Sequence, residues 1–213
     1  MENLAITYAF TEQYKHNVTT SWSFNRNYTG MLNYNYQAPI KSFEPFKNSK
    51  AAILQSPWLA IIKDINVKPL PGQFSFSDNV TRTYIESHAR DITSAPGAID
   101  YTQTQYNKTF NVSRNYSTRW DLTKNIKLDL TATNLGRVLE NPNNLGANVT
   151  ANDRNTVEHN LLVKGGTNTA YNQTVNANIL LPLNKIPALD FITQASVKYT
   201  GNYQWQRRPF AVD

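Results

Sequence analysis

The sequence predicts an all-β protein built as an antiparallel meander of long strands. Apolar and polar residues alternate along much of the chain, and this period of two is typical of strands with one apolar and one polar face. The alternating runs extend over about 13 to 16 residues, whereas strands of soluble domains usually have about 5 to 6. Aromatic residues make up 12% of the chain, with 12 tyrosines, and this composition also favours β-structure.

The clearest element is a hairpin within residues 108–134, KTFNVSRNYSTRWDLTKNIKLDLTATN. One face of its first strand is predicted to carry Phe110, Val112, Arg114, Tyr116, Thr118, Trp120 and Leu122. The other face is predicted to carry Asn111, Ser113, Asn115, Ser117, Arg119 and Asp121. After the polar residues 123–125, alternation resumes with Ile126, Leu128, Leu130 and Ala132 on the apolar face. Two alternating runs joined by so short a polar segment indicate a β-hairpin.

Alternation predicts further strands at 4–11, 18–25 and 31–38, the last beginning after Gly30. Later strands are expected at about 73–90, within 156–166 and 171–183, and from about 190 to 206, which gives roughly eight to ten strands in all. Residues 39–56 and 136–154 break the pattern and are expected to be long loops. Ser56 before Pro57 matches a helix N-terminus, so a short amphipathic helix is expected at 57–65. We interpret residues 1–213 as a single segment.

Little in the sequence suggests catalysis or metal binding. The chain has no cysteine, which excludes disulfides and cysteine-based metal sites. Its three histidines lack the spacing of a metal site. Glu86 and His88 share a strand face, but no nucleophile motif accompanies them. The sequence also lacks a nucleophile elbow, a Walker loop and a dinucleotide-binding glycine pattern. We therefore expect no enzyme activity, no cofactor and no metal.

Charge and hydropathy restrict the partners further. The net charge is +6, but Lys and Arg are scattered, so nucleic acid is not expected as a partner. No stretch is apolar enough for a transmembrane helix, and no signal peptide is recognisable. If the chain works outside the cytoplasm, we expect it to come from a longer precursor. Transmembrane barrel strands also have low mean hydropathy because they alternate, and the value here is −0.53.

We interpret the two strand faces as the two sides of a barrel wall. The apolar face is expected to meet lipid, with aromatic residues at the interfaces; the candidates are Phe110, Val112, Tyr116, Trp120, Leu122, Tyr203 and Trp205. The polar face is expected to line water; the candidates are Asn111, Ser113, Asn115, Ser117, Arg119 and Asp121. Arg114 interrupts the apolar face. It is expected to lie at an interface, to pair with an acid on a neighbouring strand, or to face protein, and the interfacial position is favoured.

Several dispersed passages of the chain resemble the SprA/Sov family. They are IKDINVKPLPGQFSFSDNVTRTYIESHARD, FNVSRNYSTRWDLTKNIKLDLTATN and LPLNKIPALDFITQASVKYTGNYQWQ. The shared features include the PWL-x-IIKD passage, the PLP turn before a Phe-rich strand, and the R-x-Y-x-x-x-W-D-L-T-K hairpin. The resemblance extends over most of residues 28–206 and keeps the order of the family's motifs.

The resemblance implies a function in protein export. This family forms the outer-membrane translocon of the type IX secretion system of Bacteroidetes, which also supports gliding motility. It implies a fragment of a very large single-chain transmembrane β-barrel, located in the outer membrane at the cell surface. The implied partners are secreted cargo proteins, a plug protein, a lipid-anchored outer-membrane protein and the outer-membrane lipid.

Two other interpretations stay open from the sequence. The segment could belong to another outer-membrane barrel, such as a TonB-dependent receptor or a porin-like protein. It could also be a soluble secreted β-sandwich or adhesin module, which predicts shorter strands and an apolar face packed against a second sheet.

Overall fold

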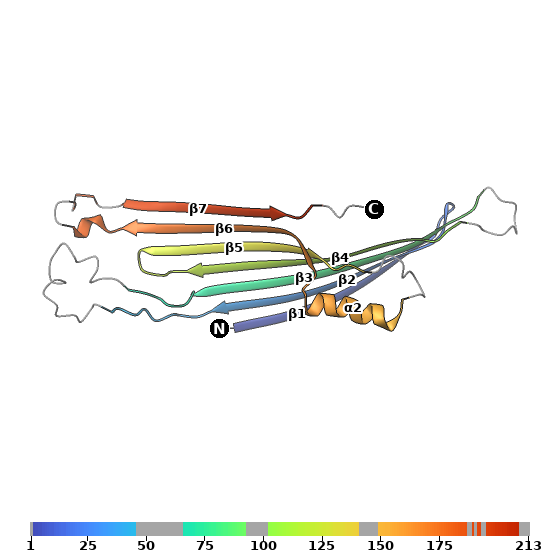
Figure 1. Cartoon of the computed structure of the whole chain (residues 1–213), viewed down its shortest axis with the longest axis horizontal. Helices are drawn as coiled ribbons and strands as arrows, with labels where there is room; N and C mark the ends of the chain where they lie inside the picture. The colour runs from blue at the N-terminus through green and yellow to red at the C-terminus, as the bar shows by residue number, and fades with distance from the viewer. Residues whose placement is uncertain are drawn as a thin grey trace.

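The described part of the chain forms one long antiparallel sheet with one short α-helix, α2, beside it (Figure 1). The computed structural model describes residues 2–45, 66–92, 102–140, 149–186, 189, 191–192 and 195–208. The seven strands are hydrogen-bonded in chain order. They are β1 (Glu2–Lys15), β2 (Thr20–Gln37), β3 (Gln73–Ala89), β4 (Gln105–Trp120), β5 (Ile126–Arg137), β6 (Thr167–Leu181) and β7 (Ala195–Gln206). The predicted all-β meander is therefore confirmed.

The structure corrects several of the predicted elements. Residues 18–25 and 31–38 belong to one strand of 18 residues, β2, which passes through Gly30 without a break. Trp22 and Leu32 lie on the same face because the period of two continues through the glycine. The last strand begins at Ala195 rather than near residue 190. The expected helix at 57–65 lies outside the described residues. Within them, seven strands are present rather than eight to ten.

The helix α2 (Ala151–Leu162) occupies sequence that was expected to be loop up to residue 154 and strand from residue 156. Its first turn is closed by a capping box, in which Thr150 and Asp153 each accept a hydrogen bond from the backbone N–H of the other. Such a box satisfies two N–H groups that the first helical turn leaves without partners. Gly165 and Gly166 follow the helix with φ of 65° and 78°, a conformation that glycine adopts at little cost. The capping box and the two glycines fix both ends of the helix.

Residues that are paired across neighbouring strands lie on the same face of the sheet. One row across the sheet runs through Leu4, Tyr34, Phe76, Tyr116, Ala132, Gln173 and Tyr203. The next row runs through Ala5, Asn33, Ser77, Asn115, Thr133, Asn172 and Gln204, on the opposite side. We call the face of the first row the aromatic face and that of the second row the amide face.

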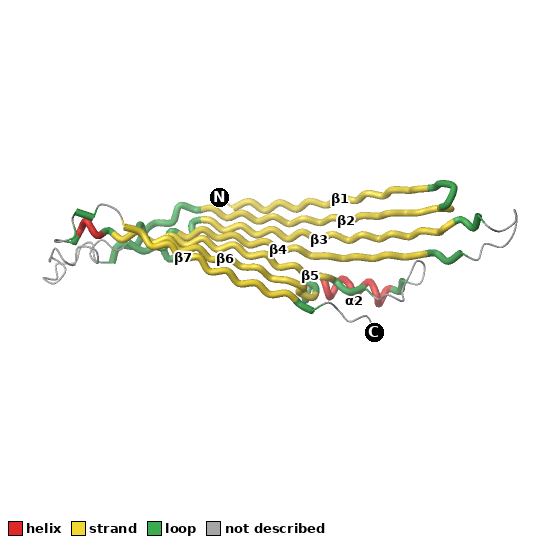
Figure 2. Tube along the Cα trace, turned by 90° about the horizontal axis from the view of Figure 1, so that it is seen from above, coloured by secondary structure: helices red, strands yellow, loops and turns green. Residues whose placement is uncertain are grey.

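A small core lies on the aromatic face at one end of the sheet. Phe110, Val112 and Val138 are buried there, and Val157 and Leu161 of α2 pack against them. Strands β1 to β4 extend past the end of β5, and α2 lies alongside this extension (Figure 2). The chain is held there as it leaves β5, because the N–H of Val138 donates to the carbonyl of Phe110.

The predicted hairpin is present as β4 and β5, but its connection is longer than expected. Residues 121–125 join the two strands, so Asp121 and Leu122 belong to the turn and not to a strand face. The side chain of Thr123 accepts hydrogen bonds from the N–H groups of Asn125 and Ile126. The buried Asn66 accepts a hydrogen bond from Lys124 N–H at 2.8 Å. These bonds satisfy the turn's backbone and fix the register of the hairpin.

Candidate functional site

The aromatic face presents apolar side chains that the described residues leave uncovered over most of the sheet. Ile6 is 73% exposed and Tyr203 is 59% exposed. Aromatic rings meet across neighbouring strands, with centroids 4.9 Å apart for Phe10 and Tyr28 and 5.1 Å apart for Phe76 and Tyr116. The exposed apolar side chains of this face lie on β1, β6 and β7, and those of the strands between them are mostly half-buried. An apolar surface of this extent marks a site of interaction with lipid or protein.

The middle of the amide face is covered by neutral hydrogen-bonding side chains. Directly opposed Thr and Asn residues are hydrogen-bonded across strands, the Thr hydroxyl donating to the Asn carbonyl oxygen; these pairs are Thr83–Asn27, Thr133–Asn115, Thr174–Asn202 and Thr200–Asn176. A furrow of about 330 Å³ lies near the middle of this face, and its lining includes Asn33, Ser75 and Ser117. Amides and hydroxyls arranged in this way are well hydrated and offer little apolar area to a passing solute.

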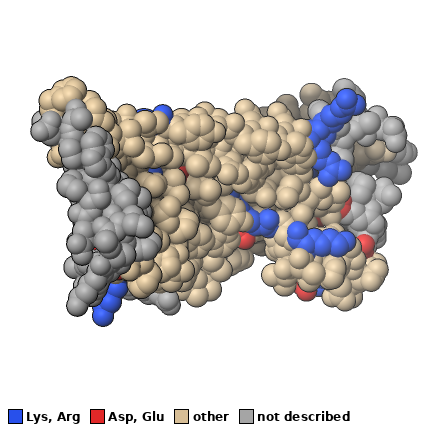
Figure 3. Space-filling view, turned by 60° about the vertical axis from the view of Figure 1, so that its left-hand side comes forward, with Lys and Arg blue, Asp and Glu red and all other residues tan. Residues whose placement is uncertain are grey.

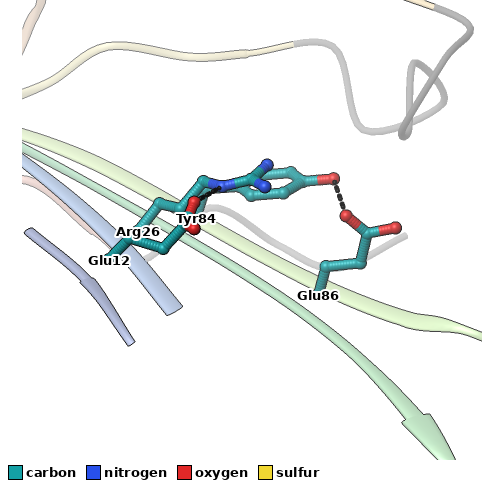
Figure 4. A network of polar contacts seen from close by, with 4 residues as sticks. All are labelled: Glu12, Arg26, Tyr84 and Glu86. Atoms are coloured by element: carbon teal, nitrogen blue, oxygen red, sulfur yellow. Dashed lines mark hydrogen bonds and ion pairs between the residues drawn. The ribbon is translucent and has the colours of Figure 1, made fainter. Parts of the chain in front are cut away.

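Among the described side chains, the charged residues of the aromatic face lie toward the end that carries α2. Figure 3 shows a broad uncharged stretch of surface and charged side chains gathered toward that end. Arg26 donates to Glu12 at 2.5 Å, and the Tyr84 hydroxyl donates to Glu86 at 3.2 Å (Figure 4). Arg26 lies directly opposite Tyr84 in the register. The aromatic face is therefore divided along the strands into an apolar part and a charged part.

Arg82 connects this charged part to the segment that precedes α2. Its Nε and Nη2 donate to the two carboxylate oxygens of Glu140 at 2.5 and 3.0 Å. The guanidinium also lies over the rings of Tyr28 and Tyr84, at 5.6 and 5.9 Å from their centroids. A two-point guanidinium–carboxylate pair has a defined geometry as well as charge attraction. It fixes residues 138–140 against β3.

Arg114 is paired within the protein. Its Nε lies 3.7 Å from an oxygen of Asp78, its direct partner on β3, and its Nη2 donates to the carbonyl of Gly165. The side chain is 17% exposed. Of the positions expected from the sequence, pairing with an acid on a neighbouring strand and contact with protein are the ones observed.

The structure separates the two predicted sets of β4 residues as expected. Asn111, Ser113, Asn115, Ser117 and Arg119 lie on the amide face, opposite to Phe110, Val112, Tyr116 and Trp120. Tyr203 and Trp205 share the aromatic face with Tyr116. Asp121 and Leu122 are the exceptions, because they lie in the turn. Asp121 and Arg119 both line a hollow of about 740 Å³ at the end of the sheet where the β4–β5 turn lies.

Two of the expected lipid-facing residues contact protein instead. Val112 is 1% exposed and Phe110 is 6% exposed, because Val138 and α2 cover them. This cover was not predicted from the sequence, because α2 was not expected. Trp120 also has a protein partner: its indole N–H donates to the carbonyl of Lys68 at 2.8 Å. Only part of the predicted apolar set therefore remains uncovered on the aromatic face.

The apolar part of the aromatic face runs obliquely across the strands. On β1 it comprises Leu4, Ile6, Tyr8 and Phe10, and on β5 it comprises Ile126, Leu128, Leu130 and Ala132. Leu4 is in the same row as Ala132, so the run on β1 begins where that on β5 ends. This offset is roughly 20 Å along the strands, over about 19 Å across them. Between β1 and β5 the apolar runs are therefore inclined by about 45° to the strand rows. On β7 the apolar run from Val197 to Trp205 lies in the rows of residues 126–134 and does not continue this inclination.

The histidines are engaged in local contacts. His88 stacks on Trp22 with ring centroids 5.7 Å apart, and its ring nitrogens lie within hydrogen-bond distance of Thr102 and Thr104. Glu86 accepts from Tyr84. Among the described residues no group of three or more His, Asp or Glu side chains could hold a metal ion.

Within the described part of the chain, none of the helices has the length and apolar character needed to cross a membrane. No protein-family model matches the sequence, and no curated protein matches it.

Proposed function

We propose that this chain is a segment of the wall of a large outer-membrane β-barrel that conducts proteins. The observation that carries the proposal is the pairing of an open aromatic face with an opposite face of amides and hydroxyls on the same seven strands. A transmembrane barrel needs this division, with apolar residues toward lipid and polar residues toward the lumen.

The inclination of the apolar band supports a transmembrane barrel. Strands of membrane barrels are tilted by about 35 to 45° from the membrane normal. A lipid belt of constant height therefore crosses such strands obliquely, as the apolar part of the aromatic face does between β1 and β5. In a soluble β-sandwich the apolar face packs against a second sheet at about 30°. The described residues form a single sheet, so they provide no such cover.

Strand length supports it as well. At about 3.4 Å per residue, the 18 residues of β2 extend over roughly 60 Å. For a strand tilted by about 45° this length corresponds to about 40 Å along the membrane normal. The hydrocarbon core is only about 30 Å thick. The long strands β2 to β4 would therefore project beyond the bilayer, and the charged part of the aromatic face with α2 is placed on this projection. There water or lipid headgroups can solvate Arg26 and Glu12.

The two edges of the sheet indicate that further strands complete the wall. Strands β1 and β7 each pair with one neighbour only among the described strands, and unpaired backbone groups are not tolerated in lipid. We propose that other strands of a longer protein pair with these edges. The resemblance to the SprA/Sov family supports the proposal that this protein is a type IX secretion translocon. Its lumen would carry folded cargo, and a plug and a lipid-anchored protein would gate it.

Fractionation of the complete protein tests this proposal. We expect it in the outer-membrane fraction, resistant to carbonate extraction and soluble only with detergent. Release by carbonate as a soluble protein would favour the sandwich or adhesin interpretation. A membrane-embedded protein whose deletion leaves cargo secretion intact would favour another class of barrel, such as a TonB-dependent receptor or a porin-like protein.

A further inference from the structure

The charges of the seven strands are divided unequally between the two faces. By register, the amide face carries five basic residues, which are Lys15, Arg119, Lys127, Arg137 and Lys198. Among the described strand residues it carries one acid, Asp129. The strand acids Glu12, Asp78 and Glu86 all lie on the aromatic face.

The three strand arginines of the aromatic face have acidic partners, whereas most cations of the amide face form no ion pair within the described residues. Arg26 pairs with Glu12, Arg82 with Glu140 and Arg114 with Asp78. On the amide face Asp129 pairs with Arg119 at 3.0 Å. Within the described residues no ion pair involves Lys15, Lys127, Arg137 or Lys198. Four positive charges on this face are therefore not compensated.

Two of these charges lie close together. Lys127 is opposite Asn178, and Asn178 is opposite Lys198, so the two lysines flank one residue in a single row. Two strand spacings separate them, about 10 Å. This distance is comparable to the Debye length at physiological ionic strength, about 8 Å, so their fields overlap at position 178. The middle rows of the face, such as the row of Ser77 and Asn115, contain only neutral residues.

We propose that the amide face presents a positive potential to the solutes that pass along it, strongest at the row of Lys127 and Lys198. It would attract the carboxylates of acidic polypeptide surfaces and disfavour basic ones. This inference rests on the proposed function, because it needs the amide face to line the aqueous path. The attraction is short-ranged, since a wide lumen is screened beyond about 8 Å from its wall. It therefore acts on a cargo that touches the wall.

The potential can be measured with charged thiol reagents. The segment lacks native cysteine, so Asn178→Cys and Ser77→Cys introduce single reporters into it in the complete protein, in native outer membranes. Each reporter is treated with an anionic sulfonate methanethiosulfonate and with its cationic trimethylammonium counterpart. We expect the ratio of anionic to cationic rate to be several-fold higher at 178 than at 77, from charge attraction at this range. At about 1 M salt, where the Debye length is about 3 Å, the difference should disappear.

The matched control replaces both lysines with neutral residues. In the Lys127→Gln/Lys198→Gln background, the ratio at 178 should fall to that at 77, and the ratio at 77 should not change. Two results would overturn the inference without affecting the proposed barrel wall. The first is an equal rate ratio at positions 178 and 77 in the native background, and the second is a high ratio at 178 that persists after the double substitution. If neither reporter reacts with either reagent, the amide face does not line water and the proposed function fails with it.

Discussion

The guanidinium of Arg114 lies 3.7 Å from the carboxylate of Asp78, directly across the β3–β4 ladder on the aromatic face. Both side chains are mostly buried, and Arg114 also donates to the Gly165 carbonyl. Removing one partner leaves a buried charge without compensation, whereas replacing both by apolar residues is often nearly neutral. The pair explains how an otherwise apolar strand face accommodates an arginine.

Substitutions at this pair should therefore be non-additive. We expect Asp78→Leu and Arg114→Met each to destabilise the protein by about 2 to 4 kcal/mol, and the double variant to cost less than either. The measurement is a double-mutant cycle on guanidinium unfolding of the complete protein in detergent. A double variant whose cost equals the sum of the two single costs would show that the two charges do not interact.

The Arg82–Glu140 pair should hold the segment after β5 against the sheet. We expect Glu140→Gln to cost about 1 to 3 kcal/mol locally, because a half-buried arginine loses its charged acceptor. The amide of Val138, which donates to Phe110, should then exchange its hydrogen about ten- to a hundredfold faster. Glu12→Gln is the matched control: its pair with Arg26 is more exposed and should contribute less than about 1 kcal/mol. Unchanged exchange at Val138 in Glu140→Gln would contradict this role.

Gly165 should not tolerate a side chain. Its φ of +65° is a conformation that L side chains rarely adopt, and a Cβ there would displace the end of the Arg114 side chain. We expect Gly165→Ala to destabilise by about 1 to 3 kcal/mol, measured as a shift of the unfolding midpoint. Gly30→Ala is the matched control because it lies within a strand with no atom within 4 Å of the added Cβ, so it should be neutral or slightly stabilising. Equal effects of the two substitutions would exclude the clash as the cause.

The contact between α2 and the sheet should depend on Val112. This side chain is 1% exposed beneath the helix, and Val112→Ala should cost about 1.5 to 3 kcal/mol through lost burial and a residual cavity. Amide exchange in α2 should accelerate in parallel. Val197→Ala removes the same atoms from a half-exposed position of the aromatic face and should leave exchange in α2 unchanged. If Val112→Ala also leaves amide exchange in α2 unchanged, the helix is held by other contacts.

The division of residues between the two faces could be predicted from the sequence, but the cover over part of one face could not. Period-two alternation assigns Ser117 and Tyr116 to opposite faces without any knowledge of the neighbouring strands. The helix α2 places only Val157 and Leu161 against the core, too few to produce an apolar stripe. Its one clear signal is the Thr150–Asp153 capping box, which lies in an Asn-rich stretch that resembles a loop.

The partner of Arg114 could not be identified from sequence either. Pairing with Asp78 depends on the register between β3 and β4, and the alternation within each strand leaves that offset undetermined. The same limit applies to the inclined apolar band, because it emerges only when the rows of five strands are aligned. At Gly30 the sequence-based prediction was wrong. The glycine suggested a strand boundary, although β2 continues through it.

Labelling of two adjacent residues of β4 tests the central claim most directly. Ser117 is on the amide face, and Thr118 is on the aromatic face between Phe74 and Leu130. Single cysteines at these positions, in the complete protein in native outer membranes, are treated with a membrane-impermeant maleimide from both sides of the membrane. The barrel wall predicts that the thiol at 117 reacts and that the thiol at 118 reacts only after detergent denaturation. Equal reaction at both positions, or no reaction at 117, would contradict a wall between water and lipid.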